Sequence, residues 1–428
     1  MLVLHFDVNE TLLLDDPAGG DTPEDCLNKI IAKSAFCRIP ASAQLDKNVP
    51  LSSVVPTQWL DGSPILGSPE GNTKNVAGIR ESEDQSRMST NNKCPGLHTD
   101  WEWPEGACPY YKTAYKKFAK TFTEHHGSGY RQIAEQIKQN LTLGEVVDGS
   151  REVDERISHD GVNHFMLPAF FHCMHKVLTE EPRRKVRLVI RTFGSDLSNV
   201  ANAITAFAEG NHPLYPDFRC PELVLKDENL YRGRWVPSQS VGVEDEESSP
   251  NGIVDDLQSV GLSHVYHLYK WNKDDTDYDT PVERMLGTCV ARGDSEVLQV
   301  IEGANKSFDE NGIAPIVCGI QDDYNFWASR DYAPHAGKPV WVQKGRAGVH
   351  HIFFDDNIHN NPDDSIVAIR SEIGDSTGLF RSLSGEEIIE MQGKHVVRVP
   401  TVEPCLNRKW FEQQIARCEA NRQNFIDE

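Results

Sequence analysis

The stretch that decides the fold lies at the start of the chain and reads LVLHFDVNETLLL, residues 2–14. Its first five residues form an apolar run of the length expected for a strand buried in a parallel sheet. Two polar side chains, Asp7 and Asn9, follow this run. Because ligands bind outside the carboxyl ends of strands in open α/β sheets, a carboxylate there can be a nucleophile, a metal ligand, or both. A simple Asp/Asn turn is the alternative.

The composition is typical of a globular protein that carries polar insertions. The chain has 428 residues, of which 38% are hydrophobic, and its mean hydropathy is −0.50. This length suits one elaborated domain or two to three domains. The net charge is −22, from 43 basic and 65 acidic residues. Such a balance disfavours nucleic-acid or acidic-membrane partners, since both require a basic face.

The ten cysteines give no sign of a structural metal or a redox motif. They are spread over the chain, and no two have C-x-x-C spacing. The N-terminal residues lack the basic and apolar regions of a secretory signal, and no run of 18 apolar residues predicts a membrane span. We therefore expect a cytoplasmic protein with reduced thiols and no membrane partner.

Apolar segments that end in polar residues recur along the chain, and we interpret them as strands of one parallel sheet. Further segments of this kind span residues 186–190, 313–320 and 352–354. The first of these ends in Thr192, followed by a turn through Phe193 and Gly194 and then by a helical pattern. A strand end followed by a helix N-terminus favours anion binding; a helix cap alone is the alternative.

The remaining strand ends are acidic. Asp322 follows the segment 313–320, and the adjacent Asp355 and Asp356 follow the last one. In a doubly wound sheet these ends converge with Asp7. At about 4 Å and an effective dielectric near 20, each pair of carboxylates repels by roughly 4 kcal/mol. A bound Mg²⁺ offsets that repulsion and receives the oxygen ligands it prefers, so we expect this cofactor.

The expected domain organisation is a sheet domain interrupted by insertions. Residues 1–14 and 181–428 should form the α/β core, with an accessory insertion at about 210–311. Residues 15–180 should form a separate insertion, in which about 39–96 are rich in Ser, Pro, Gly, Asn and Asp and are expected to be irregular or disordered. Apolar periodicity predicts helices over 23–36, 111–122, 130–141, 163–179 and 197–208, and residues 221–225 read as a strand.

Four short motifs together resemble the haloacid dehalogenase-like (HAD-like) hydrolase superfamily. They are FDVNETLL around Asp7, IRT ending at Thr192, a lysine before the last motif, and FFDDN with Asp355 and Asp356. The resemblance implies an α/β fold with a Rossmann-like doubly wound parallel sheet, a large inserted, mainly helical cap, and polar loop insertions.

The resemblance also implies roles for individual residues. Asp7 would form an aspartyl-phosphate, and a lysine would hold the phosphoryl group; Lys338 is preferred for this role and Lys344 is the second choice. The implied phosphate-binding residues besides the lysine are Thr192, Phe193 and Gly194. The implied metal-binding residues are Asp7, Asn9, Asp355 and Asp356. The expected activity is Mg²⁺-dependent hydrolysis of a small phosphorylated molecule.

One position departs from the pattern of the phosphatases in this superfamily. They carry a second Asp two residues after the nucleophile, where this chain has Asn9, which cannot exchange a proton. General acid–base help is worth about 10² to 10⁴ in rate. The substrate could therefore have a good leaving group, another residue such as Glu10 could supply the proton, or the protein could be a weak or inactive binder. A dehalogenase also lacks that Asp, but the pair Asp355–Asp356 favours a metal.

Overall fold

The structure is a computed structural model, and it divides into two compact units. Unit 1 comprises Met1–Leu13, Leu143–Val399 and Arg408–Glu428, and unit 2 comprises Leu14–Thr142 and Pro400–Asn407. The structure describes residues 1–14, 20–44, 49–65, 96–144, 153–237, 264–272, 288–303, 312–342, 348–361, 365–373 and 378–426. The boundary after the first insertion therefore lies at Thr142, whereas we expected it near residue 180.

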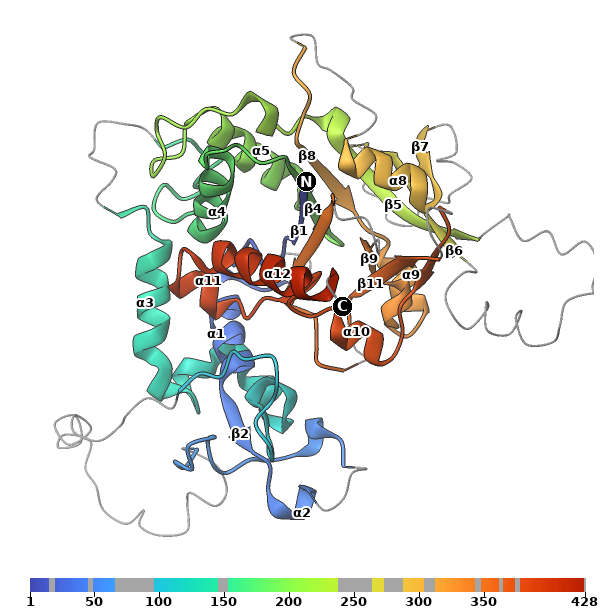
Figure 1. The fold of residues 1–428 in the computed structure, drawn as a ribbon. Helices are drawn as coiled ribbons and strands as arrows, with labels where there is room; N and C mark the ends of the chain where they lie inside the picture. The colour runs from blue at the N-terminus through green and yellow to red at the C-terminus, as the bar shows by residue number, and fades with distance from the viewer. Residues whose placement is uncertain are drawn as a thin grey trace, which may run out of the picture. The chain divides into compact units, whose positions relative to one another are not determined.

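Unit 1 is organised around a mostly parallel eight-stranded sheet (Figure 1), in the order β13-β10-β1-β4-β8-β5-β6-β7. Its strands are β1 (Leu2–Asp7), β4 (Val186–Thr192), β5 (Leu230–Pro237), β6 (His264–Lys270), β7 (Cys289–Arg292), β8 (Val317–Gln321), β10 (His350–Asp355) and β13 (Val396–Arg398). The strands from β13 to β5 are parallel, and the pairs β5–β6 and β6–β7 are antiparallel. The sheet and its helices confirm an α/β fold.

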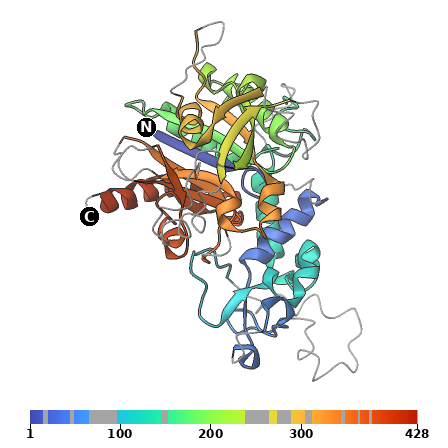
Figure 2. The same ribbon diagram turned by 90° about the vertical axis from the view of Figure 1, so that its right-hand side faces the viewer.

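Strand β1 runs through the middle of this sheet, between β10 and β4 (Figure 1 and Figure 2). Its side chains alternate between the two faces. Phe6 lies in the larger apolar core, where its ring stacks on Phe354 at 4.8 Å and meets Phe170 edge to face. Val3 lies in the second core with Val189. Both faces of β1 are thus buried, which explains an apolar run that only the buried His5 interrupts.

Helices and a small sheet complete unit 1. The larger core includes residues of α4 (Pro168–Thr179), α5 (Leu197–Ala208) and α12 (Trp410–Ile426). The second core includes residues of α8 (Gly293–Glu302) and of a three-stranded sheet of β9 (Lys338–Val342), β11 (Val367–Glu372) and β12 (Phe380–Ser382). Two short helices, α9 (Tyr324–Ser329) and α10 (Glu386–Glu390), also belong to unit 1.

Two parts of unit 1 differ from the expectations. The described part of the accessory insertion contributes strands β5 to β7 and helix α8, so it extends the main sheet. The strand expected over 221–225 is wrong, because Pro221–Leu223 form a 3-10 helix. Proline suits the first position of a helical turn, because its φ is fixed at about −65° and the N–H that it lacks would have no partner there. Among the described residues, no helix is long and apolar enough to cross a membrane.

Unit 2 is mainly helical. Its helices are α1 (Pro23–Ser34), α2 (Ala41–Gln44), α3 (Arg131–Leu141) and α11 (Val402–Leu406), with 3-10 segments at Leu51–Ser53, Tyr110–Lys112, Ala114–Glu124 and Ser128–Tyr130, and a ribbon of β2 (Phe36–Arg38) and β3 (Ala107–Pro109). Thr22 caps α1 in a capping box with Asp25, as the sequence predicts. The helix expected over 111–122 is wrong in type, because 3-10 turns replace it and Thr121 interrupts them with non-helical backbone angles. Residues 66–95 of the segment expected to be irregular lie outside the described residues.

Candidate functional site

The polar strand ends of the four central parallel strands lie side by side. Strands β10, β1, β4 and β8 are consecutive neighbours in the sheet. Asp355 is the last residue of β10, Asp7 of β1 and Thr192 of β4. Parallel pairing in register places these ends at the same edge of the sheet. The topology therefore brings three of the motifs together.

Three carboxylates form a compact cluster at this edge. One oxygen each of Asp7, Asp355 and Asp356 lies within 4.8 Å of the others. All three side chains are buried, and Asp355 has no exposed surface. At that separation and an effective dielectric near 20, each ionised pair repels by about 3 kcal/mol. A cluster of this kind requires protons or cations to be stable.

Lys338 supplies one of those cations. It is the first residue of β9, and its Nζ donates to Asp355 Oδ2 at 2.9 Å and to Asp7 Oδ1. Burial opposes its charge, but Asp355 and Asp7 raise the pKa of Lys338 above its ordinary value. It therefore remains an ammonium group between the two carboxylates. The second choice from the sequence, Lys344, lies outside the described residues.

The surroundings of Asp7 disfavour its ionised form, as expected at a site that binds a further cation. Burial raises the pKa of Asp7 well above its usual range, and the charges of Asp355 and Asp356 raise it further. Lys338 acts in the opposite direction but does not reverse the shift. The Lys338 ammonium group alone does not offset burial and the two neighbouring carboxylates, so an added cation would favour the ionised form of Asp7.

A tight turn after β1 positions Asn9. Val8 O accepts hydrogen bonds from the N–H groups of Thr11, Leu12 and Leu13, and Glu10 has a left-handed φ of 54°. The turn is tied to β10 by the N–H of Asp356, which donates to Thr11 Oγ1 at 3.2 Å.

The side chain of Asn9 carries an unused acceptor. Its Oδ1 atom is buried and has no hydrogen-bond partner within the part of the chain that the structure describes. An unsatisfied buried carbonyl oxygen is costly and is a suitable ligand for a hard cation.

The turn after β4 lies against Asn9. The N–H of Gly194 donates to Thr192 Oγ1 at 2.8 Å. A methyl group at Gly194 would lie 2.8 Å from Asp196 Oδ2, 3.3 Å from Thr192 Oγ1 and 3.4 Å from Asn9 Nδ2. Glycine, which has no Cβ, therefore leaves these polar groups undisturbed. Phe193 takes a different position, with its ring 4.8 Å from Lys338 Nζ and stacked on Trp327.

Asp322 does not join the carboxylate cluster, although it follows a neighbouring strand. Both of its oxygens accept hydrogen bonds from Arg191, at 2.9 and 2.5 Å, and Tyr266 donates to one of them. Arg191 also donates to Pro339 O at 2.8 Å, next to Lys338. This buried pair therefore helps to hold the lysine strand in place.

Sequence reasoning missed several supporting residues. Arg191 lies inside an apolar strand, and a charged residue at such a position could have indicated a buried ion pair. Asn357 donates its backbone N–H to Asp355 Oδ1 at 2.9 Å and its amide group to Asp356 Oδ1 at 3.0 Å. Arg398 ends β13 in register with Asp355 and interacts electrostatically with Asp356. Asn357 follows the acidic pair directly, whereas nothing local in the sequence marks Arg398.

We compared the chain with protein-family models, with curated proteins and with solved structures, and none of the three comparisons gave a match.

Proposed function

We propose that this protein is a Mg²⁺-dependent HAD-like phosphohydrolase that acts on a small phosphorylated molecule through an aspartyl-phosphate on Asp7. The observation that supports the proposal is the convergence of Asp7, Asp355, Asp356 and Lys338, with Thr192 on the neighbouring strand. These residues come from the four motifs that resemble the superfamily. The Rossmann-like class belongs to the same proposal, as does the assignment of unit 2, inserted in the sequence after β1, as the cap.

The donor set fits Mg²⁺. The cluster offers only oxygen atoms from carboxylates, and Asn9 Oδ1 adds a buried acceptor without a hydrogen bond among the described residues. Hard divalent cations prefer such ligands. The residues that would hold the ion are Asp7, Asn9, Asp355 and Asp356. When bound, Mg²⁺ would neutralise carboxylate charge and polarise phosphoryl oxygens.

The chain's own residues account for the covalent steps. A carboxylate oxygen of Asp7 attacks phosphorus, so that an O–P bond forms while the bond from phosphorus to the leaving oxygen breaks. The Lys338 ammonium group, which already contacts Asp7, stabilises the negative charge of the transferred group. The Thr192 hydroxyl accepts from Gly194 N–H and can donate its hydrogen to a phosphoryl oxygen. Water then attacks phosphorus while the O–P bond to Asp7 breaks, which releases inorganic phosphate and the Asp7 carboxylate. One hydrogen of the water stays on the phosphate, and the other leaves as a proton to solvent.

Asn9 restricts the substrates. Its amide cannot give a proton to the leaving oxygen, so the proposal favours leaving groups that depart as stable anions, as those of acyl phosphates and aryl phosphates do. Glu10, buried in the same turn, is the nearest carboxyl in the sequence to that position. Alkyl phosphates should react more slowly, because their leaving oxygen needs a proton.

Release of inorganic phosphate from a panel of acyl, aryl and alkyl phosphates, with Mg²⁺ and with EDTA, tests the proposal. We expect turnover of acyl phosphates that needs Mg²⁺ and disappears in Asp7→Asn, a variant that keeps the shape of the side chain. Turnover that persists in Asp7→Asn or in EDTA would exclude this mechanism.

A catalytically weak or inactive binding protein is the second candidate, and Asn9 is the observation that favours it. The variant Asn9→Asp separates the two. If the catalytic machinery is otherwise complete, this variant should hydrolyse alkyl phosphates at least about 100-fold faster than the wild type, the lower end of the range for general acid–base catalysis. If wild type and Asn9→Asp are both inactive on the whole panel, the binding function is the better assignment. A dehalogenase ranks third, because it would not require the acidic pair Asp355–Asp356.

A further inference from the structure

A second candidate site lies at the amino-terminal ends of the parallel strands, whereas Asp7 lies at their carboxyl-terminal ends. A cavity of about 760 Å³ is lined by the residues that precede or begin β4, β5 and β8, such as Lys185, Tyr231 and Ile316. All of its lining residues belong to unit 1. Its volume falls in the range of small-molecule binding sites, about 300–1,000 Å³. The candidate site at Asp7 is at the other ends of these parallel strands, so the two sites are separate.

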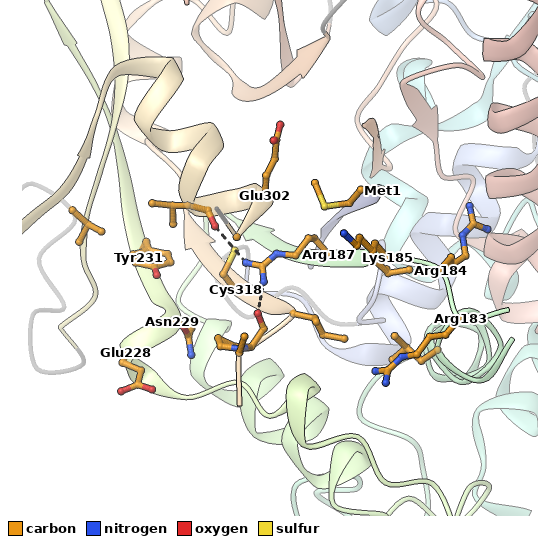
Figure 3. A pocket seen from close by; sticks show the side chains of 18 of the residues that line it. Met1, Arg183, Arg184, Lys185, Arg187, Glu228, Asn229, Tyr231, Glu302 and Cys318 are labelled. Atoms are coloured by element: carbon orange, nitrogen blue, oxygen red, sulfur yellow. Dashed lines mark hydrogen bonds between the residues drawn. The ribbon is translucent and has the colours of Figure 1, made fainter. Parts of the chain in front are cut away.

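The cavity is basic, in contrast to the protein as a whole. The run RRKVR, residues 183–187, contributes four cations to its wall, and Lys270 contributes another. Two of these are paired, Arg183 with Glu222 at 3.2 Å and Arg184 with Glu419. The carboxylates that line the cavity are Glu228 and Glu302. Figure 3 shows Glu228 on the opposite side of the cavity from the basic run.

Arg187 provides a fixed cation inside this cavity. It donates to Ile301 O at 3.0 Å, to Val300 O at 3.3 Å and to Pro315 O, and Figure 3 shows its guanidinium group held near the centre of the view. Among the described residues it has no carboxylate partner. A guanidinium group has five N–H donors, so two remain for a ligand.

Lys185 and Arg187 are two residues apart at the start of β4, and extended backbone directs such side chains to one face. Lys185 is exposed and has neither an ion pair nor a side-chain hydrogen bond in the described structure. An exposed lysine beside a fixed arginine is an arrangement suited to phosphate.

The rest of the wall suits the body of an organic ligand. Val186, Ile316 and Cys318 are apolar or weakly polar, and the phenol ring of Tyr231 is partly buried beside them. Asn229 adds an amide group. A small ring could pack on the phenol while its phosphate faces the cations.

We propose that this cavity binds a phosphorylated small molecule of mononucleotide size, with its phosphate at Lys185 and Arg187 and its ring against Tyr231. This site is independent of the proposed hydrolysis at Asp7.

The test measures binding of AMP by titration calorimetry to full-length Asp7→Asn protein in EDTA, where hydrolysis is prevented. We expect saturable binding, at least tenfold weaker in Lys185→Glu, with adenosine alone binding more weakly than AMP. Lys270→Glu, at another exposed lysine of the wall, should weaken binding in the same direction. The matched control is Lys176→Glu, an exposed lysine that does not line the cavity, and it should leave the affinity unchanged.

The two proposals fail separately. No saturable binding at millimolar AMP, or binding that Lys185→Glu and Lys270→Glu leave unchanged, would overturn the second site, whatever the phosphatase panel shows. Melting curves of each variant without ligand check that folding is intact. If Lys185→Glu unfolds, Lys185→Ala replaces it, and the same tenfold weakening is expected.

Discussion

The variant Lys338→Met tests the charge balance on which the candidate site depends. In the wild type, Lys338 Nζ contacts both Asp7 and Asp355. Methionine has similar length and fills the same space, but it leaves three buried carboxylates within 4.8 Å of one another without this cation. Removing one partner of a buried ion pair typically costs about 3–5 kcal/mol, since the remaining charge is uncompensated.

Two estimates agree on the size of the effect. Coulomb's law at an effective dielectric near 20 gives about 5 kcal/mol for two opposite charges at 3 Å, and relief of the buried lysine's own desolvation subtracts from that value. We therefore expect the free energy of unfolding to fall by roughly 3 kcal/mol at neutral pH. For a unit of this size the melting temperature should fall by about 6 °C.

Urea unfolding in EDTA provides the assay, and a double-mutant cycle shows where the energy comes from. Asp355→Asn removes one of the repelling charges, so the pair Lys338→Met and Asp355→Asn should be less unstable than the sum of the two single changes by about 2 kcal/mol. Adding Mg²⁺ should stabilise Lys338→Met, because a bound cation replaces the lost charge. The control Lys270→Met, at an exposed lysine, should change stability by less than about 0.5 kcal/mol.

Two results would refute this reasoning. If Lys338→Met is as stable as the wild type in EDTA, the lysine does not compensate the carboxylates. If the double-mutant cycle shows additive effects, Lys338 and Asp355 do not interact, and the proposed site loses its central contact.

Two further predictions concern the turn after β4 and two buried histidines of unit 1. Gly194→Ala should lower phosphatase turnover at least about tenfold, because its methyl group would lie 2.8 Å from Asp196 Oδ2 and would crowd Thr192 Oγ1 and Asn9 Nδ2; unchanged kcat would contradict it. Burial lowers the pKa of His164 to about 4 and that of His212 to about 3, so the unfolded chain binds more protons and stability falls as pH drops below about 6.5. Between about pH 6.5 and 5, the free energy of unfolding of His164→Phe should fall by roughly 2 kcal/mol less than that of the wild type, as measured by urea titration. Equal decreases in the two proteins would contradict this prediction.

The main elements of the sheet could be predicted because their signals are local. A mainly apolar run such as that before Asp7 reflects burial on both faces of a central strand, and the polar residue at its end marks the strand terminus. The helix after Thr22 was equally clear, because its cap and first turn are written in adjacent residues.

The partners of these residues could not be derived in the same way. Lys338 lies on a strand of a second sheet, and no pattern around it indicates that its side chain reaches Asp7. Strand β5, with the sequence LYRGRWVP, contains two arginines and a glycine that obscure its burial. Asp322 has the same local pattern as the acidic strand ends, but a buried arginine from another strand neutralises it. Such pairings are long-range and depend on the whole fold.

The charges around the candidate site set an order of binding. Arg191 is committed to Asp322, so the cations near the cluster in the described part of the chain are Lys338 and Arg398. Burial lowers the pKa of Arg398, with the Asp356 carboxylate opposing that shift. Two cations do not balance three carboxylates. A phosphate group that approached this edge alone would therefore meet net negative charge, whereas a divalent cation would meet attraction. Phosphate should thus bind appreciably only after the cation, and its affinity should depend on Mg²⁺ even in Asn9→Asp, where an additional carboxylate makes the cluster more negative.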